Sequence, residues 1–367
     1  MASGKVAAVV GGQFGSESKG AVTAWLAEQV QGPLMAVRVA GPNAGHTAVG
    51  VLDGKAWPLR TIPAVAVRNL SAGLVIAAGS EVDPAVLADE IEQLEEAGYK
   101  VLDRLWVDPQ ATWLGPEFIE QEKQLGIQAR IGSTSKGIGA SRAARIMRTA
   151  DLVGDRLTED ERLGKMSKLR WEVDTAELLH QHLREGGDVL IEGTQGYGLG
   201  LHAGYYPQCT SSDCRAVDFL AMAGISPWAA EVESVEPWVV CRTFPIRVAG
   251  NSGPLSDETT WEQLEQESGG YIQAERTTVT KKIRRVGRWD PHLVRRALAA
   301  NGGPETARLF LGFMDYIDPT VAGAKTPEEL TDRAWEFIEQ VEQQVGRRPD
   351  ALGTGPASQI DLRGVER

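Results

Sequence analysis

The sequence predicts an α/β fold in which helices flank a mainly parallel central sheet. Short apolar runs with the length of strands recur along the chain, at residues 6–10, 34–39, 73–78, 189–191, 238–244 and 309–313. Helical patterns lie beside two of them, at 86–97 after the third run and at 175–183 before the fourth. This alternation of strands and helices is typical of a parallel sheet. Glycine-rich segments follow several runs, and the strand ends of such sheets are where ligands bind.

The length and composition indicate a soluble globular protein with a large core. The 367 residues show no internal repeat and no low-complexity tract, so we expect one domain over 1–367 with smaller peripheral excursions. Apolar content of 42% and charged content of 24% are ordinary, and no run of about 18 apolar residues exists. The stretches 155–170 and 255–270 are polar and charged, and we expect surface helices or loops there.

The charge and the cysteines exclude several classes of protein. A net charge of −12 argues against a general nucleic-acid or membrane binder. The three cysteines form no CxxC pair, which excludes a cysteine metal cage or disulfide framework from our expectations. The N-terminus lacks the form of a signal peptide, and we expect a cytoplasmic protein. Within residues 276–296 only Asp290 is acidic, while the cations are Arg276, Lys281, Lys282, Arg284, Arg285, Arg288, Arg295 and Arg296.

The first apolar run leads into the glycine-rich loop GGQFGSESKG at residues 11–20, which opens onto an amphipathic segment. Six residues separate Gly12 from Lys19, so the loop does not fit the usual G-x-x-x-x-G-K-[ST] form. Backbone N–H groups of residues 15–20 at a helix start, together with Lys19, suit the binding of a transferred phosphate. The alternative for Lys19 is a solvated surface lysine.

Four further glycine-rich segments stand at strand ends or element boundaries. They are GPNAGHT (41–47), GSTSKGIG (132–139), EGTQGYGLG (192–200) and GTGP (353–356). Glycine allows positive φ and close approach of the backbone to a ligand. Each segment taken singly is consistent with a tight turn. Five such loops with serine and threonine hydroxyls in one chain favour a ligand site.

These segments resemble the motifs of the adenylosuccinate synthetases, in the family's order and over nearly the whole chain. GQFGSESKG is followed about 25 residues later by NAGHT, and IGSTSKGIG, EGTQG, YPQCTSS, TVTKKIRRVG and GTGP match later motifs. The resemblance implies a P-loop-like α/β fold and a carbon–nitrogen ligase. Members join aspartate to the 6-position of a purine nucleotide, using a nucleoside triphosphate and Mg²⁺.

Two departures from the family pattern lie in the first loop. The family's catalytic aspartate, which deprotonates N1 of the purine and contacts Mg²⁺, aligns with Ser16, and a glycine of that motif aligns with Ser18. A short chain with GSES in this place resembles the phage enzymes that make 2-amino-2′-deoxyadenylosuccinate from dGMP. A neutral serine is a poor base, but its oxygen accepts a hydrogen bond from N1–H or the 2-amino group of guanine, which a longer carboxylate would crowd.

The resemblance also implies roles for the catalytic residues. Lys19 would hold the transferred phosphate, and His46 would act on the 6-oxygen or its phosphate as a general acid or electrophile. Ser16 would take the catalytic position of the family aspartate. Mg²⁺ would be bound by Ser16 and by the carbonyl of Gly45, since this ion accepts backbone oxygens and keeps several waters.

The remaining site residues come from the same comparison of motifs. The purine nucleotide pocket would comprise Ser16, Asn43, Thr134, Arg148, Gln195, Thr210, Val248 and Lys282. Arg148 would reach the 5′-phosphate in the neighbouring subunit, which implies a homodimer; in SRAARIMR it follows Arg142 and Arg145 at spacings of three, on one face of a predicted helix. A solvated basic stripe is the alternative. Aspartate would be bound by Thr278, Val279, Thr280 and Arg284, or else these residues form a basic surface loop.

The triphosphate site is implied to comprise Gly15, Glu17, Ser18, Lys19, Gly20, Gly45, His46, Thr47, Phe313, Asp315, Gly353 and Gly355. Members that use GTP have Lys-x-Asp near the end of a strand, whereas this chain has Phe313-Met314-Asp315. An aromatic ring stacks on either purine, and we favour ATP or dATP.

Three hypotheses for the function follow. The first is a Mg²⁺-dependent ligase that acts on dGMP, aspartate and ATP or dATP, in the host cytoplasm if the gene belongs to a phage. The second is an ordinary adenylosuccinate synthetase that uses IMP and GTP, with a drifted base. The third is a catalytically silent nucleotide-binding protein. Only small-molecule substrates and a second copy of the chain are expected as partners.

Overall fold

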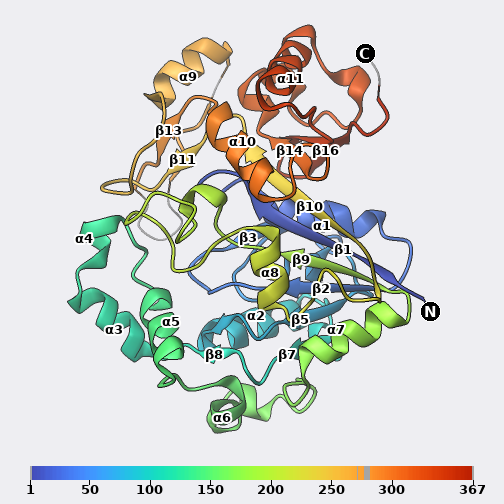
Figure 1. Cartoon of the computed structure of the whole chain (residues 1–367), viewed down its shortest axis with the longest axis vertical. Helices are drawn as coiled ribbons and strands as arrows, with labels where there is room; N and C mark the ends of the chain where they lie inside the picture. Colours follow the sequence, from blue (N-terminus) through green and yellow to red (C-terminus); the bar gives the residue numbers. More distant parts are fainter. Residues whose placement is uncertain (1, 271, 277–281, 366–367) are drawn as a thin grey trace.

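The computed structural model describes residues 2–270, 272–276 and 282–365, and a nine-stranded sheet forms its centre (Figure 1). Neighbouring strands are parallel, except that β15 and β16 at one edge are antiparallel. The strand order is β16 (Ser358–Asp361), β15 (Ala351–Gly355), β14 (Arg308–Gly312), β10 (Val232–Arg242), β1 (Gly4–Gly11), β9 (Asp188–Glu192), β2 (Leu34–Arg38), β5 (Gly73–Ile76) and β7 (Leu105–Val107). The predicted α/β class with a mainly parallel sheet is confirmed.

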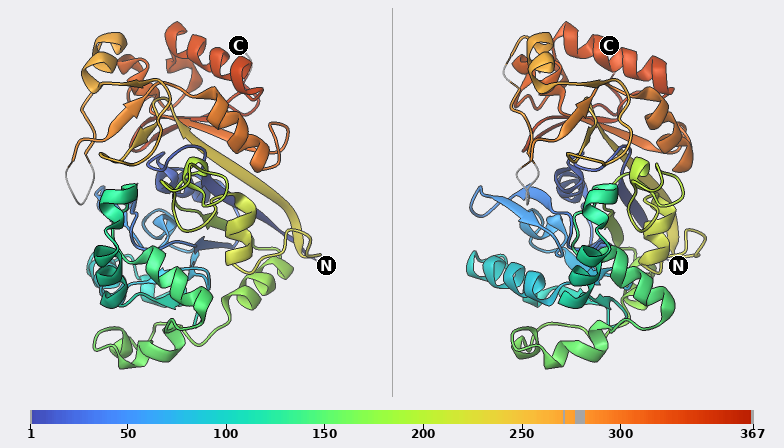
Figure 2. Two further views of the ribbon diagram at one scale, coloured as in Figure 1. Left: turned by 60° about the vertical axis from the view of Figure 1, so that its left-hand side comes forward. Right: turned by 90° about the vertical axis from the view of Figure 1, so that its left-hand side faces the viewer.

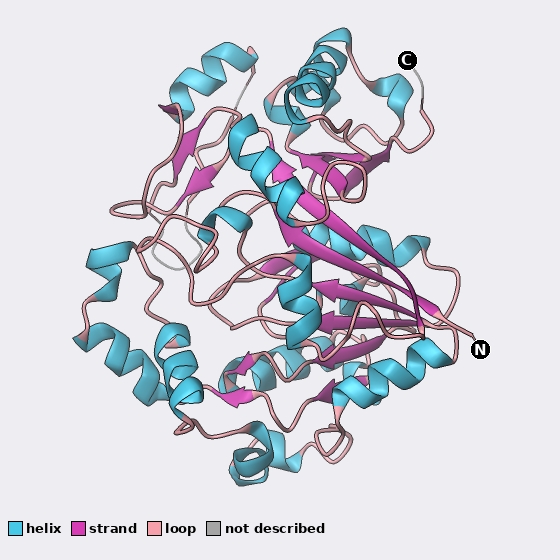
Figure 3. Ribbon diagram, in the orientation of Figure 1, coloured by secondary structure: helices cyan, strands magenta, loops and turns pink. Residues whose placement is uncertain are grey.

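Helices cover both faces of this sheet (Figure 3), and each face has its own apolar core. Along β1, Val6, Ala8 and Val10 pack into one core while Val9 packs into the other. A strand buried on both faces is continuously apolar, which explains the runs in the sequence. The helices over the first face are α7 (Thr175–Arg184), α8 (Ala216–Met222), α10 (Pro291–Ala300) and α11 (Asp332–Val345), and those over the second are α1 (Lys19–Gln29) and α2 (Pro84–Glu96).

The helix boundaries follow capping chemistry. Asp83 precedes α2, and its carboxylate accepts hydrogen bonds from the backbone N–H groups of Ala85 and Val86, with Pro84 in the first helical position. Asp174 caps α7 in the same way, and the predicted helices at 86–97 and 175–183 correspond to α2 and α7.

Smaller elements lie around the central sheet. Two pairs of short strands are β3 (His46–Val49) with β4 (Ala56–Leu59), and β6 (Glu81–Val82) with β8 (Thr112–Trp113). A three-stranded sheet consists of β11 (Ile246–Arg247), β13 (Arg285–Gly287) and β12 (Glu258–Thr259), beside α9 (Trp261–Ser268). The remaining helices are α3 (Pro116–Gln124), α4 (Ile127–Ile131), α5 (Ile138–Met147) and α6 (Val153–Arg156). In Figure 2, α6 lies at the opposite end of the molecule from α9 and α11.

Short 3₁₀ turns connect these elements at η1 (Ala64–Val67), η2 (Val101–Asp103), η3 (Leu157–Glu159), η4 (Leu163–Lys165), η5 (Tyr197–Leu199), η6 (Met314–Tyr316), η7 (Pro319–Val321) and η8 (Pro327–Glu329). The polar stretch 155–170 therefore contains short turns, whereas 255–270 contains a strand and a helix. Within the described part of the chain, no helix is both long enough and apolar enough to span a bilayer.

The predicted strand at 238–244 was wrong in its boundaries. β10 begins at Val232, six residues earlier, and ends at Arg242. Its first half contains Glu233, Glu236 and Pro237, which do not read as a buried strand. This half pairs with β1 alone, because β14 pairs with β10 only from Trp238 onward. An edge position tolerates proline and charged side chains, which explains the missed start.

Candidate active site

Several of the predicted site residues follow the carboxyl ends of the parallel strands. In the strand register, Arg38 of β2 stands opposite Glu192 of β9, and Arg242 of β10 stands opposite Gly312 of β14. The loops that follow these residues therefore start at one edge of the sheet. This is the edge at which open α/β sheets bind ligands.

The loop after β1 contains three residues in the left-handed region. Gly15, Ser16 and Ser18 have φ values of 82°, 59° and 70°. This conformation costs free energy for a serine, so the surrounding contacts must hold it. Ser18 precedes α1 without a capping bond from its side chain. The first N–H groups of α1 are thus available to an anion at the helix start, as the sequence predicts.

Glu17 and Lys19 form a buried ion pair inside this loop. The Lys19 ammonium donates to the Glu17 carboxylate at 2.6 Å, and the two side chains are 2% and 0% exposed. The other carboxylate oxygen of Glu17 accepts from the backbone N–H groups of Gln13 and Gly15, at 3.0 and 2.8 Å. Glu17 therefore fixes the shape of the loop, and Lys19 points toward it.

Ser16 is exposed, and its contacts join the first loop to two others. Its hydroxyl oxygen accepts from the Arg284 guanidinium at 3.1 Å, and its carbonyl accepts from Arg242 at 3.2 Å. The residue at the family's aspartate position thus touches a residue predicted to bind the substrate aspartate. Three further predicted aspartate ligands lie outside the described residues, namely Thr278, Val279 and Thr280.

His46, the first residue of β3, is buried under the start of α1. A Cβ atom on Gly20 would lie 2.6 Å from the His46 Cβ, so this position of α1 requires glycine. Nδ1 of His46 lies 2.7 Å from the Glu192 carboxylate, and Arg38 contacts both groups. An ionised carboxylate only accepts, so we assign Nδ1–H as the donor to Glu192, which leaves Nε2 to face a ligand. Burial, and next the charge of Arg38, lower the pKa of His46 to about 4, and the ring is neutral at pH 7.

Glu192 and Arg38 are site residues that the sequence analysis missed. Their side chains are 0% and 1% exposed and 2.5 Å apart. The second oxygen of Glu192 accepts from the Ala64 N–H at 2.7 Å. Burial alone would raise the pKa of Glu192, but Arg38 and the His46 N–H hold it below its usual value. The sequence offered one signal for them, since Arg38 lies near the end of the apolar run 34–39 and Glu192 directly follows the run 189–191.

Local contacts fix the loops that carry several residues of the predicted purine pocket. Gln195 is left-handed, with φ of 59°, and its Cα would lie 3.8 Å from a Cβ on Gly15. The Thr210 N–H donates to the carbonyl of Leu199 at 2.7 Å, which ties YPQCTSS to the loop after β9. The Val248 carbonyl accepts from the Ser252 hydroxyl at 2.5 Å.

The other predicted pocket residues lie on further loops and elements. Gly132 packs against Ser252, which brings the loop that carries Thr134 toward Val248. Asn43 is half-buried between β2 and β3, while Lys282 and Thr134 are exposed.

Phe313 and Asp315 follow β14 at the same edge. Phe313 is left-handed, with φ of 64°, and the Arg242 guanidinium lies 3.9 Å from the centre of its ring. Burial raises the pKa of Asp315 to about 6. A Cβ on Gly353 would lie 3.2 Å from the Cα of Gly312, so the segment GTGP starts beside the end of β14.

The predicted stripe of Arg142, Arg145 and Arg148 on one helix face was wrong. Arg142 is 14% exposed and pairs with buried Glu81 at 2.6 Å. Arg148 lies past the last residue of α5, with φ of 63°, so the helical spacing does not extend to it. Its side chain is exposed beside Ile146 and Met147.

The donor set suits a magnesium ion that arrives with a nucleotide. In the described part of the chain, no group of three or more His, Cys, Asp or Glu side chains is placed to hold a metal. The predicted ligands, the Ser16 hydroxyl and the Gly45 carbonyl, are neutral oxygens, and both residues are exposed. Mg²⁺ keeps waters and phosphate oxygens in its coordination sphere, so such ligands fit it.

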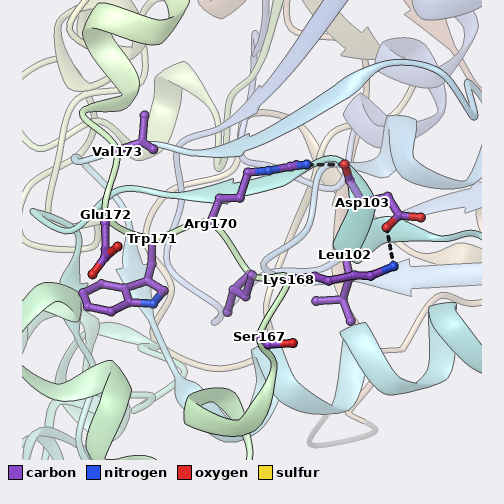
Figure 4. A pocket seen from close by; sticks show the side chains of 9 residues that line it. Leu102, Asp103, Ser167, Lys168, Arg170, Trp171, Glu172 and Val173 are labelled. Atoms are coloured by element: carbon purple, nitrogen blue, oxygen red, sulfur yellow. Dashed lines mark hydrogen bonds and ion pairs between the residues drawn. The ribbon is translucent and has the colours of Figure 1, made fainter.

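A cavity of about 450 Å³ lies away from these loops, beside η2 and residues 167–173 (Figure 4). Its wall contains the ion pair of Lys168 and Asp103, 2.8 Å apart, and the Arg170 side chain, which donates to the Asp103 carbonyl. None of the predicted site residues lines it.

Comparison with known proteins identifies the family. The family model described as adenylosuccinate synthetase matches residues 8–172 and 161–319. The adenylosuccinate synthetase of Methanocaldococcus jannaschii is 36% identical over 358 residues, which cover 97% of this chain and 96% of the relative. That of Methanococcus vannielii is 34% identical over 97% of this chain and 98% of its own.

Two solved structures share the fold. One is the succinoaminodeoxyadenylate synthetase PurZ of cyanophage S-2L, described as bound to dGMP and to dATP as an energy donor. It has a TM-score of 0.78 and 27% identity, over 96% of this chain and 93% of that one. The fully ligated adenylosuccinate synthetase of Plasmodium falciparum has a TM-score of 0.79 at 20% identity, over 98% and 100% of the two chains. The chain is therefore a member of the adenylosuccinate synthetase family and a carbon–nitrogen ligase.

Proposed function

We propose that this ligase condenses dGMP with L-aspartate to give 2-amino-2′-deoxyadenylosuccinate, with ATP or dATP as the energy donor. The observation that carries the proposal is the exposed hydroxyl of Ser16 at the position of the family's catalytic carboxylate. The cyanophage enzyme with the same fold supports it, since that protein is described as bound to dGMP and dATP.

The reaction consists of two transfers. The 6-oxygen of the purine attacks the γ-phosphorus of the triphosphate, and the nucleoside diphosphate leaves. The amine of aspartate then attacks C6, and the 6-oxygen departs as part of inorganic phosphate. Phosphoryl transfer of this kind depends on positioning and on neutralisation of charge.

Ser16 suits a purine with a 2-amino group. Arg284 donates one hydrogen bond to its hydroxyl oxygen, at 3.1 Å. A hydroxyl oxygen has two acceptor positions, so once Arg284 turns to the substrate aspartate they suffice for Mg²⁺ and for N1–H or the 2-amino group of guanine. An aspartate in this place would be longer and charged, and would crowd the 2-amino group.

Lys19 and His46 supply the other predicted catalytic groups. Lys19 would have to exchange its buried partner Glu17 for a phosphate oxygen. His46, held by Glu192 through Nδ1, presents Nε2 to the 6-oxygen, and it donates there only after it gains a proton. Bound Mg²⁺ would neutralise charge on the phosphates, with the oxygens of Ser16 and Gly45 as its protein ligands.

The base of the triphosphate would lie near Phe313 and Asp315. The family's lysine at the first position is an aromatic ring here, and aromatic rings stack on adenine as well as guanine. This substitution and the dATP named for the cyanophage enzyme favour an adenine nucleotide.

A homodimer would complete the site. Arg148 is exposed beside Ile146 and Met147, whose side chains are 71% and 70% exposed. Large apolar side chains that are this exposed mark contact surfaces. We place this segment at the interface, from which Arg148 reaches the 5′-phosphate in the neighbouring subunit. The enzyme would act in the cytoplasm, that of the host if a phage encodes it.

A second candidate function is the ordinary reaction with IMP and GTP. The archaeal relatives are named adenylosuccinate synthetases, and they are 34% to 36% identical to this chain, against 27% for the cyanophage enzyme. The substitution at Ser16 is the feature that this alternative leaves without a function.

The deciding experiment measures phosphate release with aspartate and with dGMP or IMP, each combined with ATP, dATP or GTP. We expect turnover with dGMP and an adenine nucleotide. Turnover of IMP without dGMP would establish the ordinary synthetase. No turnover in any combination would indicate a silent nucleotide-binding protein.

A further inference from the structure

Arg242, the last residue of β10, is fully buried among loops that carry three groups of predicted site residues. Its backbone and its guanidinium both form contacts there. Among the described residues, the charge is paired with the carboxylate of Glu275, which accepts from both terminal nitrogens. Burying an arginine costs free energy unless its partners are well placed. Each contact of Arg242 therefore constrains the position of the group that it touches.

The first group is the phosphate loop. The side-chain amide of Gln13 donates to the Arg242 carbonyl and accepts from the Arg242 N–H, each at 3.0 Å. The guanidinium also donates to the Ser16 carbonyl at 3.2 Å. These contacts fix the backbone of the loop to the end of β10, and with it the direction of the Ser16 hydroxyl.

The second group is the predicted aspartate loop. The carbonyl of Glu275 accepts from the Arg284 N–H at 2.8 Å, and the Arg284 side chain donates to the Ser16 hydroxyl at 3.1 Å. Arg276 and Ile283 form a bridge between the two ends of this loop. The carboxylate that Arg242 holds therefore belongs to the base of the loop that carries Arg284.

The third group is the predicted platform for the triphosphate base. The Arg242 guanidinium lies 3.9 Å from the centre of the Phe313 ring. The Phe313 carbonyl accepts from the Thr243 hydroxyl at 2.9 Å, and the Tyr316 hydroxyl donates to Glu275 at 3.3 Å. A cation over an aromatic face is attracted to it most strongly away from water, as here.

We propose that Arg242 is a positioning residue that couples the triphosphate base site to the aspartate site. A base that stacks on Phe313 shifts the ring against Arg242. The resulting displacement of the Arg242 guanidinium moves Ser16, which it contacts directly, and moves Arg284 through Glu275. Each ligand then strengthens the binding of the other, because a coupling free energy between two sites is reciprocal. The inference rests on the proposed positions of the base and of aspartate.

The test measures binding of the β,γ-imido analogue of ATP by calorimetry, with and without L-aspartate and dGMP. In the wild type we expect aspartate and dGMP to lower the dissociation constant of the analogue by about 5-fold or more, the usual scale of coupling between sites. In Arg242→Lys, which keeps the charge but lacks the planar fork, we expect less than about 2-fold tightening. Phe313→Leu leaves Arg242 and Glu275 in place and should lose the coupling as well.

Arg104→Lys is the matched control. Arg104 is also a buried arginine, 8% exposed, and donates to backbone carbonyls such as those of Ala66 and Ala72, away from the site loops. This variant should lower thermal stability and retain the wild-type coupling.

An Arg242→Lys or Phe313→Leu variant with wild-type coupling would overturn the proposal, as would a wild type without coupling. If Arg242→Lys does not fold, Phe313→Leu decides. The experiment measures binding and does not require turnover. If the enzyme uses IMP and GTP, the same coupling is measured with IMP and the β,γ-imido analogue of GTP. Failure of the dGMP assignment is therefore distinguishable from failure of the coupling.

Discussion

Replacing Ser16 by aspartate restores the charge and length of the family's carboxylate at this position. The new carboxylate would crowd the 2-amino group and would pair with Arg284, whose guanidinium lies 3.1 Å from the present hydroxyl. We expect kcat/KM for dGMP to fall by about 10-fold or more, the scale of an unpaired buried polar group. Steady-state kinetics with dGMP and IMP measure the change.

Ser16→Ala serves as the control for this variant, because it removes the hydroxyl without adding charge. If Ser16→Asp used dGMP as well as the parent does, the steric account of the serine would be wrong.

Replacing His46 by alanine removes the predicted acid or electrophile at the 6-oxygen. We expect kcat to fall by about 100-fold or more, the usual scale for a lost acid–base group. His292→Ala, an exposed position in the first turn of α10, is a control that should retain turnover. Near-parental turnover of His46→Ala in single-turnover and steady-state assays would rule out the role.

The pKa of His46 also predicts how stability depends on pH. Its pKa is lowered from 6.5 to about 4 in the folded protein, so between these values the unfolded chain binds a proton that the folded chain does not. This contribution to stability is present above pH 6.5 and is lost as the pH falls toward 4. Urea unfolding of the wild type and of His46→Gln between pH 7 and 5 should show a weaker pH dependence in the variant. Equal slopes would contradict the assignment.

The sequence predicted those site residues that lie within a recognisable local motif. Lys19 and His46 lie within glycine-rich segments, and the loop that contains each was recognisable from local spacing. Arg38, Glu192 and Arg242 have partners that are distant in the chain. Glu192 is 154 positions from Arg38, and Arg242 is 226 positions from Ser16. Local patterns show only a charged residue at or near the end of an apolar run, and the folded sheet alone reveals which of these groups pair.

At the scale of the element, the first loop depends on a buried ion pair. In Glu17→Gln the amide would leave the Lys19 ammonium without its carboxylate. Breaking one partner of a buried pair destabilises a protein by about 3–5 kcal/mol. The control is Glu92→Gln, because Glu92 pairs with Arg162 at 2.7 Å but both side chains are exposed, and we expect a loss below about 1 kcal/mol there. Urea unfolding of both variants compares them, and equal losses would refute the role of Glu17.

The elements were predicted where burial is uniform and were missed where it is not. β1, β2, β5 and β9 have apolar centres, with charged residues only near their ends, and their positions were clear from the sequence. β10 carries glutamates and a proline in the half that lies at an edge, and its start was missed. α5 ends at Met147 because Arg148 adopts a left-handed conformation, which the spacing of the arginines does not reveal.

At the scale of the whole molecule, one sheet with β16 and β7 at its edges aligns loops from distant parts of the chain. The loops after β1, β9 and β14 carry predicted phosphate, purine and base contacts, and the predicted aspartate contacts lie between α9 and β13, farther along the chain from β10. Arg148 stands apart from this group, because no described contact joins it to the other site residues. A role for Arg148 in the site of a second copy accounts for both its exposure and its separation.

Mixing two inactive variants tests this arrangement. Arg148→Ala would lack the phosphate contact given to the partner, and His46→Ala would lack the catalytic histidine of its own site. In a mixed dimer, the site on the Arg148→Ala chain has its own His46 and receives the partner's Arg148. Random exchange of equal amounts should therefore restore about a quarter of the wild-type activity, because half of the dimers are mixed and one of their two sites is complete. Phosphate release after denaturation and joint refolding measures it, with each variant refolded alone as the control. If Arg148 acts within its own subunit, no mixed dimer contains a complete site, and the mixture would remain as inactive as its parts.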